Sequence, residues 1–161
     1  MRITRTLTGL AIASAFVALA PLAANAEAGS SDAVAAHTRT WGSYYAPSHA
    51  AKALGSLTAT GEDHADLPVA ATVKISGKVT DLTRKAACGW AVFRITYRDG
   101  TNLPFKEQSV RDCSYGSPKP FSLRYRNVYQ VELKVCSERK AAKPSLNCLY
   151  AGTWKTLYLS K

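Results

Sequence analysis

The sequence predicts an all-β protein: an antiparallel β-sandwich of about seven strands with two disulfides and an irregular N-terminal arm. Two observations carry this prediction. From residue 51 onward apolar and polar residues alternate with a period of two, as in strands with one buried and one solvated face, and no long stretch has helical spacing. In addition, four cysteines follow an N-terminal export signal, and an oxidising compartment favours their pairing.

Residues 1–26 have the features of a secretory signal peptide. Two arginines precede an apolar run over residues 7–22, which is too short to span a bilayer, and residues 24–26 form a small-residue cleavage site. We therefore expect a secreted, extracellular protein. Because no second apolar run follows the signal, we expect no membrane anchor.

Removal of 26 of the 161 residues leaves 135, a usual size for one domain, which we place at residues 50–161. The predicted mature chain keeps 19 of the 21 basic residues and all 11 acidic ones, a net charge of +8. The charge is uneven: residues 27–70 carry −3 and residues 71–161 carry +11. This basic protein could attract teichoic acid, anionic polysaccharide, nucleic acid or an acidic protein surface.

Residues 27–49 are rich in Ala, Ser and Gly and lack a sustained period, which indicates a flexible N-terminal arm. Within the arm, however, Trp41, Tyr44, Tyr45 and Pro47 lie close together. So much aromatic area is not expected to stay in water. The cluster either caps an open end of its own domain or docks on a partner.

Alternation predicts most of the strands of the sandwich. Over residues 72–82, three apolar side chains share one face, with a glycine, Gly77, that we expect to mark a bulge or bend. Residues 121–125 and 129–135 alternate in the same way and are each expected to form a half-buried strand. Residues 51–60 and 152–160 are weaker patterns that we place as the first and last strands.

Residues 88–97 are apolar on both faces, which predicts a central strand. The strand runs into Asp99-Gly100, a strong hairpin-turn signal. Cys88 and Cys113 are equidistant from this turn, so an undistorted hairpin places them opposite each other, and we expect a disulfide between them.

The remaining cysteines, Cys136 and Cys148, would then close a charged loop at its base. Four cysteines permit three connectivities, so this pairing depends on the hairpin assignment. Each bridge contributes on the order of 3 kcal/mol by restricting the unfolded chain.

The sequence offers little for catalysis. The three histidines, His37, His49 and His64, all lie in the front third, and the carboxylates around His64 match no zinc or calcium pattern. There is no Gly-x-Ser-x-Gly turn, no unpaired cysteine, no facing pair of carboxylates and no glycine-rich phosphate loop. We therefore expect that the protein is not an enzyme and that it has no metal site and no cofactor.

Basic residues on the wet faces of strands are the candidates for binding. Arg124 and Arg126 flank Tyr125, and Lys134 lies on the strand that we expect next. Such a stripe could bind phosphate or sulfate groups or an acidic protein surface, although strand alternation alone also explains it. The tyrosines fall mostly in the apolar phase of the strands, which argues against nucleic acid, since base stacking needs exposed rings.

Three segments resemble the small exported β-sandwich proteins of mycelial actinobacteria: residues 73–81, residues 88–93 and residues 131–136. The plan is also similar to that of the small adaptor of umbrella toxin particles, a sandwich whose N-terminal arm docks one partner while its body holds another. This resemblance implies a non-catalytic adaptor, with Trp41, Tyr44 and Tyr45 in the docking arm.

Our first hypothesis is accordingly a non-catalytic secreted interaction protein, an adaptor or accessory subunit in an extracellular assembly such as an antibacterial toxin particle. One alternative is a binder of anionic cell-envelope polysaccharide, because of the positive charge of the sandwich. The other is a small secreted protease inhibitor that uses the disulfide-held loop of residues 137–147.

Overall fold

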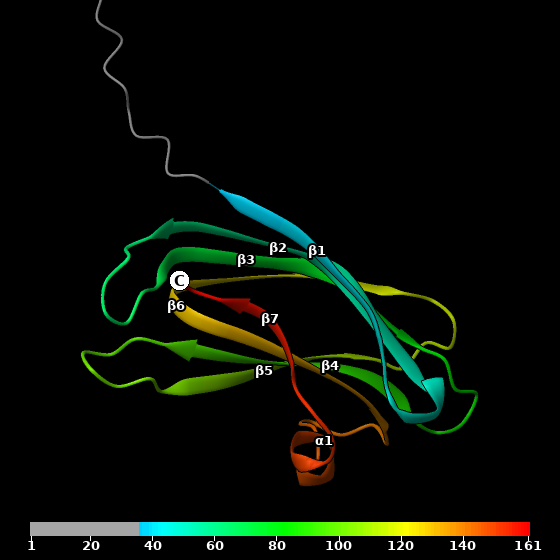
Figure 1. The fold of residues 1–161 in the computed structure, drawn as a ribbon. Coiled ribbons are helices and arrows are strands. Elements are labelled where there is room, and N and C mark those ends of the chain that lie inside the picture. The colour runs from blue at the N-terminus through cyan, green and yellow to red at the C-terminus, as the bar shows by residue number, and fades with distance from the viewer. Residues whose placement is uncertain (1–35) are drawn as a thin grey trace, which may run out of the picture. The chain divides into compact units, whose positions relative to one another are not determined.

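The computed structural model of the protein describes residues 36–161, and Figure 1 shows their fold. The predicted signal peptide, and the arm as far as residue 35, lie outside the described residues. The strands are β1 (His37–Tyr45), β2 (Ala51–Glu62), β3 (Ala70–Asp81), β4 (Cys88–Tyr97), β5 (Phe105–Asp112), β6 (Lys119–Glu138) and β7 (Lys155–Leu159). A 3₁₀ turn, η1 (Pro47–His49), follows β1, and a short helix, α1 (Leu146–Tyr150), precedes β7.

The seven strands form one antiparallel sheet that folds on itself into two layers (Figure 1). The strand order is β1-β2-β3-β6-β4-β5, and β7 also pairs with β6. Residues 119–128 of β6 pair with β3, and residues 128–138 pair with β4, so β6 belongs to both layers. The predicted antiparallel sandwich of about seven strands is confirmed.

The sequence predicts separate strands at residues 121–125 and 129–135, whereas the structure joins them in the 20-residue strand β6. The change of layer occurs near Asn127, which has a φ of 54°, a left-handed conformation that asparagine tolerates better than most residues. Thus the pattern shows the two half-buried segments correctly, but the link between them is a bend and not a turn.

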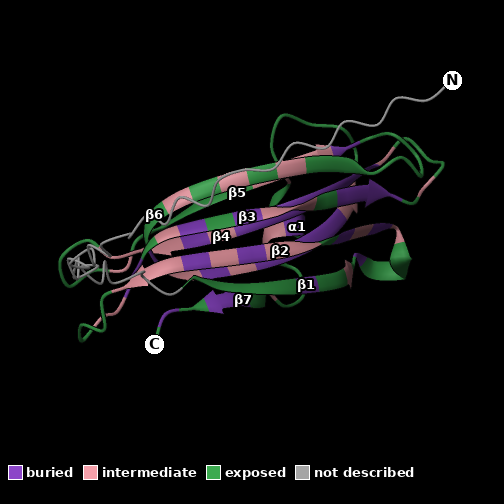
Figure 2. Ribbon diagram, turned by 90° about the horizontal axis from the view of Figure 1, so that it is seen from above, coloured by how far each residue is buried: buried purple, intermediate pink, exposed green. Residues whose placement is uncertain are grey.

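The main core lies between the layers and contains the apolar side chains that alternate along the strands. Figure 2 shows buried and less buried residues alternating along β2 and β3. Its largest fully buried members are Phe93, Leu57, Ile75, Ile95 and Leu133. No helix among residues 36–161 is long and apolar enough to cross a membrane.

Strand β4 is buried on both faces, as predicted for a central strand, and lies between β5 and β6. Phe93 and Ile95 face the core between the layers. Trp90 and Val92 face the outer side of their layer, where a second cluster includes both cysteines of the Cys136–Cys148 bridge.

Both predicted disulfides are present, Cys88–Cys113 and Cys136–Cys148, and no cysteine in the described chain is free. The hairpin between β4 and β5 has the predicted register, with Gly89 opposite Asp112 and a turn bounded by Asp99 and Asn102. This register places Cys88 beside Cys113, with their Cα atoms 4.2 Å apart.

The predicted irregular arm over residues 27–49 is wrong for its described second half. His37–Tyr45 forms the edge strand β1, so the sheet begins at residue 37 and not at residue 50. The physical reason is Trp41: it is 7% exposed and packs in the core, which gives this segment enough buried apolar area to become ordered.

The predicted bulge at Gly77 is also wrong, because the register of β3 with both of its neighbours is continuous there. Gly77 lies opposite Gly55 on one side and Phe121 on the other, and Gly55 lies opposite Trp41. A Cβ atom on Gly77 would lie 2.9 Å from the Phe121 ring. The glycines therefore make room for two large rings.

Candidate functional site

The outer face of the layer formed by β1, β2, β3 and the first half of β6 carries five cations, none of which forms an ion pair within the described residues. Alternation along the strands turns every second side chain to this face. Its cations are Lys52, Lys74, Lys78, Arg124 and Arg126, of which all but the half-buried Lys52 are exposed. We call this surface the cationic face.

The sheet register brings cations from different parts of the sequence together. Lys74 of β3 is the direct partner of Arg124 of β6, and Arg126 follows two residues later on the same strand. Adjacent strands are about 4.8 Å apart, and residues i and i+2 on one strand about 6.8 Å apart. Like charges placed directly opposite in a sheet are unfavourable, so the arrangement is not explained by the stability of the sheet.

No carboxylate offsets these charges. The outward positions of these strand segments carry no Asp or Glu. Within residues 36–161 the ion pairs all lie elsewhere: Arg94 pairs with Glu107 and Glu132, and Arg98 pairs with Asp63. The five cations are therefore available to a ligand.

Hydroxyl groups fill the space between the cations. The outward positions include Thr38, Thr40, Ser56, Thr58, Thr60, Thr72, Ser76 and Ser122. The Thr38 and Thr58 hydroxyls lie 2.8 Å apart and those of Ser76 and Ser122 3.4 Å apart, both across strand pairs. Each hydroxyl can donate and accept, so the face suits a charged and hydroxylated ligand.

One exposed aromatic ring lies at the end of the cationic face: Tyr45 of β1 is the cross-strand partner of Lys52. The aromatic residues Trp41 and Phe121 of the same strands point to the opposite, inner side. A single ring, which packs edge-on against His49, does not form the row of exposed rings on which successive nucleic-acid bases stack.

The structure separates the predicted stripe of Arg124, Arg126 and Lys134. The two arginines lie on the cationic face, but Lys134 is 5% exposed and lies on the outer side of the other layer. The reason is the course of β6: odd-numbered residues face the core both before the bend (residues 121–125) and after it (residues 131–135), so the even-numbered residues of these two segments point outward in opposite directions.

Lys134 has a structural role instead. Its Nζ atom donates hydrogen bonds to the carbonyl oxygens of Leu149 (2.9 Å), Ala151 (2.8 Å) and Gly152 (3.4 Å). Burial, together with the charge of Arg94, lowers the pKa of Lys134. Three carbonyl acceptors match the three donors of the ammonium group, so Lys134 fastens the chain at the end of α1.

The aromatic cluster at residues 41–47 is also divided. Trp41 is buried, Tyr44 is half-buried against the core, and Tyr45 is 47% exposed with its ring against His49. This cluster caps its own domain, as one of the two interpretations requires. The buried indole of Trp41 is not accessible to a partner.

Three residues of the cationic face were not singled out by sequence reasoning: Lys52, Lys74 and Lys78. The alternation in residues 72–82 places Lys74 and Lys78 on a solvated side, which is a usable signal. The position of Lys74 next to Arg124, however, depends on the pairing of β3 with β6, a contact between distant parts of the chain.

The carboxylates and histidine around residue 64 serve local structure. Asp63 accepts a hydrogen bond from the Val69 N–H at 3.0 Å and pairs with Arg98, and these contacts lower its pKa. His64 Nδ1 lies 3.1 Å from the carbonyl oxygen of Lys161. In residues 36–161 no group of three or more His, Cys, Asp or Glu side chains could hold a metal ion.

A groove of about 640 Å³ lies between η1, the loop that joins β3 to β4, and the end of β6. Among its lining residues are His49, Lys85, Lys134 and Glu138. The polar atoms of two of them are already engaged, since Lys134 holds the carbonyl oxygens after α1 and Glu138 accepts two hydrogen bonds from Ser145. The groove thus presents no paired acid and base, and the cationic face remains the better candidate for function.

Comparison of the chain with protein-family models, with curated proteins and with solved structures finds no match.

Proposed function

We propose that this protein is a secreted, non-catalytic binding protein whose cationic face holds an anionic polymer of the cell envelope. The observation that carries the proposal is the set of five cations, with Lys74 directly opposite Arg124, on a face without a carboxylate. A polymer with regularly spaced phosphate, sulfate or carboxylate groups can contact several of these cations at once, and the hydroxyls between them can bind its polar backbone.

Export supports this function, since the polymer would lie outside the membrane. The two disulfides are the form that cysteines take in an oxidising compartment, and the N-terminal signal provides the route. Mass measurement of the secreted protein is expected to show an N-terminus at Glu27.

The hypothesis of an adaptor that docks through an aromatic arm has less support. One of its supports is the aromatic cluster at residues 41–47 as a docking segment, and Trp41 of this cluster is buried inside the domain. The protease-inhibitor hypothesis depends on the loop of residues 137–147 and not on the cationic face, and it is tested separately below.

Sedimentation with purified cell walls tests the polymer hypothesis. Walls that carry teichoic acid are compared with walls from which hydrofluoric acid has removed it, and soluble polyphosphate serves as competitor. We expect binding to the intact walls only. Raising the salt from 50 to 200 mM should weaken binding at least tenfold. Salt screens the contacts between the cations and the polymer, and it lowers the entropy gained when binding releases counterions from the polymer.

A pair of charge-reversal variants gives the sharpest control. Lys74→Glu with Arg124→Glu changes the centre of the cationic face, and Lys106→Glu with Lys155→Glu makes the same change of net charge on exposed residues of the other layer. We expect the first variant to bind at least tenfold more weakly and the second to bind like the unchanged protein. An equal loss in both variants would show that only net charge matters and would refute a specific face.

A further inference from the structure

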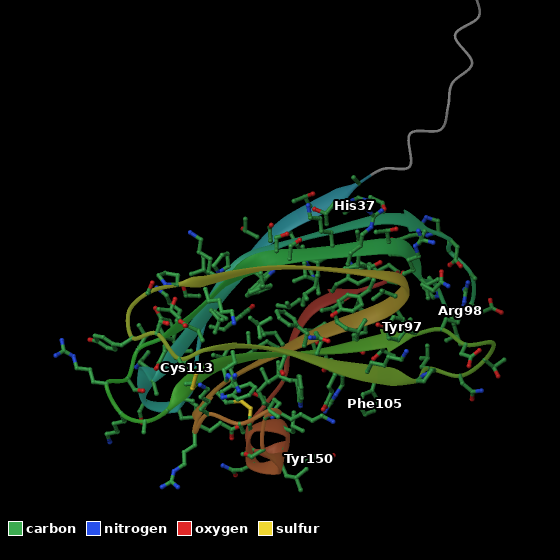
Figure 3. The ribbon with its side chains drawn as sticks, turned by 180° about the vertical axis from the view of Figure 1, so that it is seen from behind. His37, Tyr97, Arg98, Phe105, Cys113 and Tyr150 are labelled. Carbon is green, nitrogen blue, oxygen red and sulfur yellow. A yellow bond between two sulfur atoms is a disulfide. The ribbon has the colours of Figure 1, made fainter. Side chains whose placement is uncertain are left out.

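The short helix α1 exposes two large apolar side chains on the outer side of the layer that carries β4 and β5. Leu146 is 72% exposed and Tyr150 is 76% exposed. They are four residues apart, so they lie on the same side of the helix. Figure 3 shows Tyr150 on the side of α1 that points away from the sheets.

This segment is held firmly from beneath. Cys148, at the centre of α1, is bonded to Cys136 of β6, and Leu149 packs on the cluster around Trp90. At the far end, Lys134 holds the carbonyl oxygens of the residues that end and follow the helix.

The start of the helix is fixed as well. The Ser145 hydroxyl accepts a hydrogen bond from the Cys148 N–H at 3.2 Å. The carboxylate of Glu138 accepts from both the backbone N–H and the hydroxyl of Ser145, at 2.7 and 2.5 Å. A disulfide, a cap and a buried ammonium group therefore hold a helix of five residues.

Rigid, exposed apolar side chains are what an interface anchor requires. The fold gains little from Leu146 and Tyr150, because most of their surface stays in water. A partner that covers them would gain this burial without the entropy cost of ordering the segment, since the disulfide and caps already order it.

The charges around the two anchors indicate the kind of partner. Arg139, Lys140 and Lys143 are exposed in the loop before α1, and within the described residues none forms an ion pair. The one carboxylate between Cys136 and Cys148, that of Glu138 at the end of β6, accepts hydrogen bonds from Ser145. A second copy would bring the same cations together, whereas an acidic surface would attract them.

We propose that Leu146 and Tyr150 form a protein-docking knob that inserts into an apolar pocket bordered by Asp and Glu side chains on a different protein. The knob and the cationic face lie on opposite layers of the sandwich, so one molecule can use both at once. This inference does not depend on the proposed binding of polymer.

Site-specific photocrosslinking tests the knob. The full chain is expressed in its own host with p-benzoylphenylalanine in place of Tyr150 or, as a control, in place of Tyr115. Tyr115 is also an exposed tyrosine, 52% exposed, but it lies in the turn between β5 and β6. After irradiation, adducts are sought in the cells and the medium and identified by mass spectrometry.

We expect one protein to be crosslinked at position 150 and not at position 115, through a peptide that contains apolar residues flanked by Asp or Glu. Leu146→Asp, or reversal of the three loop cations to Glu, should reduce the adduct at least tenfold without changing the melting temperature. Absence of an adduct, an equal adduct at position 115, or an adduct that survives both changes would overturn the proposal.

Discussion

The rings of Trp41 and Phe121 stack on the inner side of one layer, with their centroids 6.4 Å apart and their planes at 26° to each other. They come from β1 and β6, and Gly55 and Gly77 are the only residues between them in the cross-strand row. Phe93 of the facing layer contacts both rings edge-on, at 6.1 and 5.4 Å. This aromatic contact fastens the edge strand β1 to the core.

Gly55→Ala should test this packing. An added Cβ would lie 2.1 Å from the Ser76 carbonyl oxygen and 2.7 Å from the Trp41 ring, so the strands or the ring must move. We expect the free energy of unfolding to fall by about 2 kcal/mol in urea denaturation. Ser56→Ala, on the outer face of the same strand, should change it by less than about 0.5 kcal/mol. Similar values for the two variants would contradict the packing argument.

Lys134→Met should loosen the end of α1. Methionine fills a similar volume but leaves the carbonyl oxygens of Leu149, Ala151 and Gly152 without their donor. We expect the free energy of unfolding to fall by about 2 kcal/mol, and hydrogen exchange in α1 to become faster. The exposed Lys155 provides the matched control, Lys155→Met, for which little change is expected. Unchanged exchange in α1 would show that these hydrogen bonds contribute nothing.

Stability should fall at alkaline pH. Burial, and secondarily the neighbouring Tyr97, raise the pKa of Tyr125 to about 12, whereas an exposed tyrosine titrates near pH 10. The folded state therefore favours the neutral hydroxyl of Tyr125. The contribution of this hydroxyl to the free energy of unfolding is complete below pH 10 and is lost as the pH rises from about 10 to about 12. Urea unfolding at a series of pH values measures this loss. In the variant Tyr125→Phe, the free energy of unfolding should fall less steeply with pH. An equally steep fall in the variant and the unchanged protein would show that other groups cause the loss.

Trypsin should distinguish an exposed loop from an inhibitory one. Arg139, Lys140 and Lys143 are exposed between the two cysteines of the Cys136–Cys148 bridge. For a binding protein we expect slow cleavage in this loop with no loss of trypsin activity towards a small substrate. Stoichiometric inhibition, with the loop kept intact, would instead support the protease-inhibitor hypothesis.

Local patterns in the sequence are sufficient for a large part of this fold. Alternation identifies β2, β3 and both halves of β6, and a run that is apolar on both faces identifies β4, because both patterns depend only on neighbouring residues. The pairing of Cys88 with Cys113 also follows, since a tight turn at Asp99-Gly100 determines the register of the hairpin around it.

The position of β1 is a different case. The composition of residues 37–45 indicates an irregular segment, and one side chain, Trp41, reverses this by packing over Gly55 of β2 and stacking on Phe121 of β6. Burial of a ring depends on the partners that the fold supplies, which the local sequence does not show.

Tertiary structure also determines which residues form the cationic face and where Lys134 lies, for the same reason. Alternation shows that Lys74, Arg124 and Lys134 each point away from the core, but not in which direction. The bend in β6 turns Arg124 and Lys134 to opposite outer surfaces, and the pairing of β3 with β6 brings Lys74 beside Arg124. Both relations join residues far apart in the chain, and only packing of the whole domain selects them.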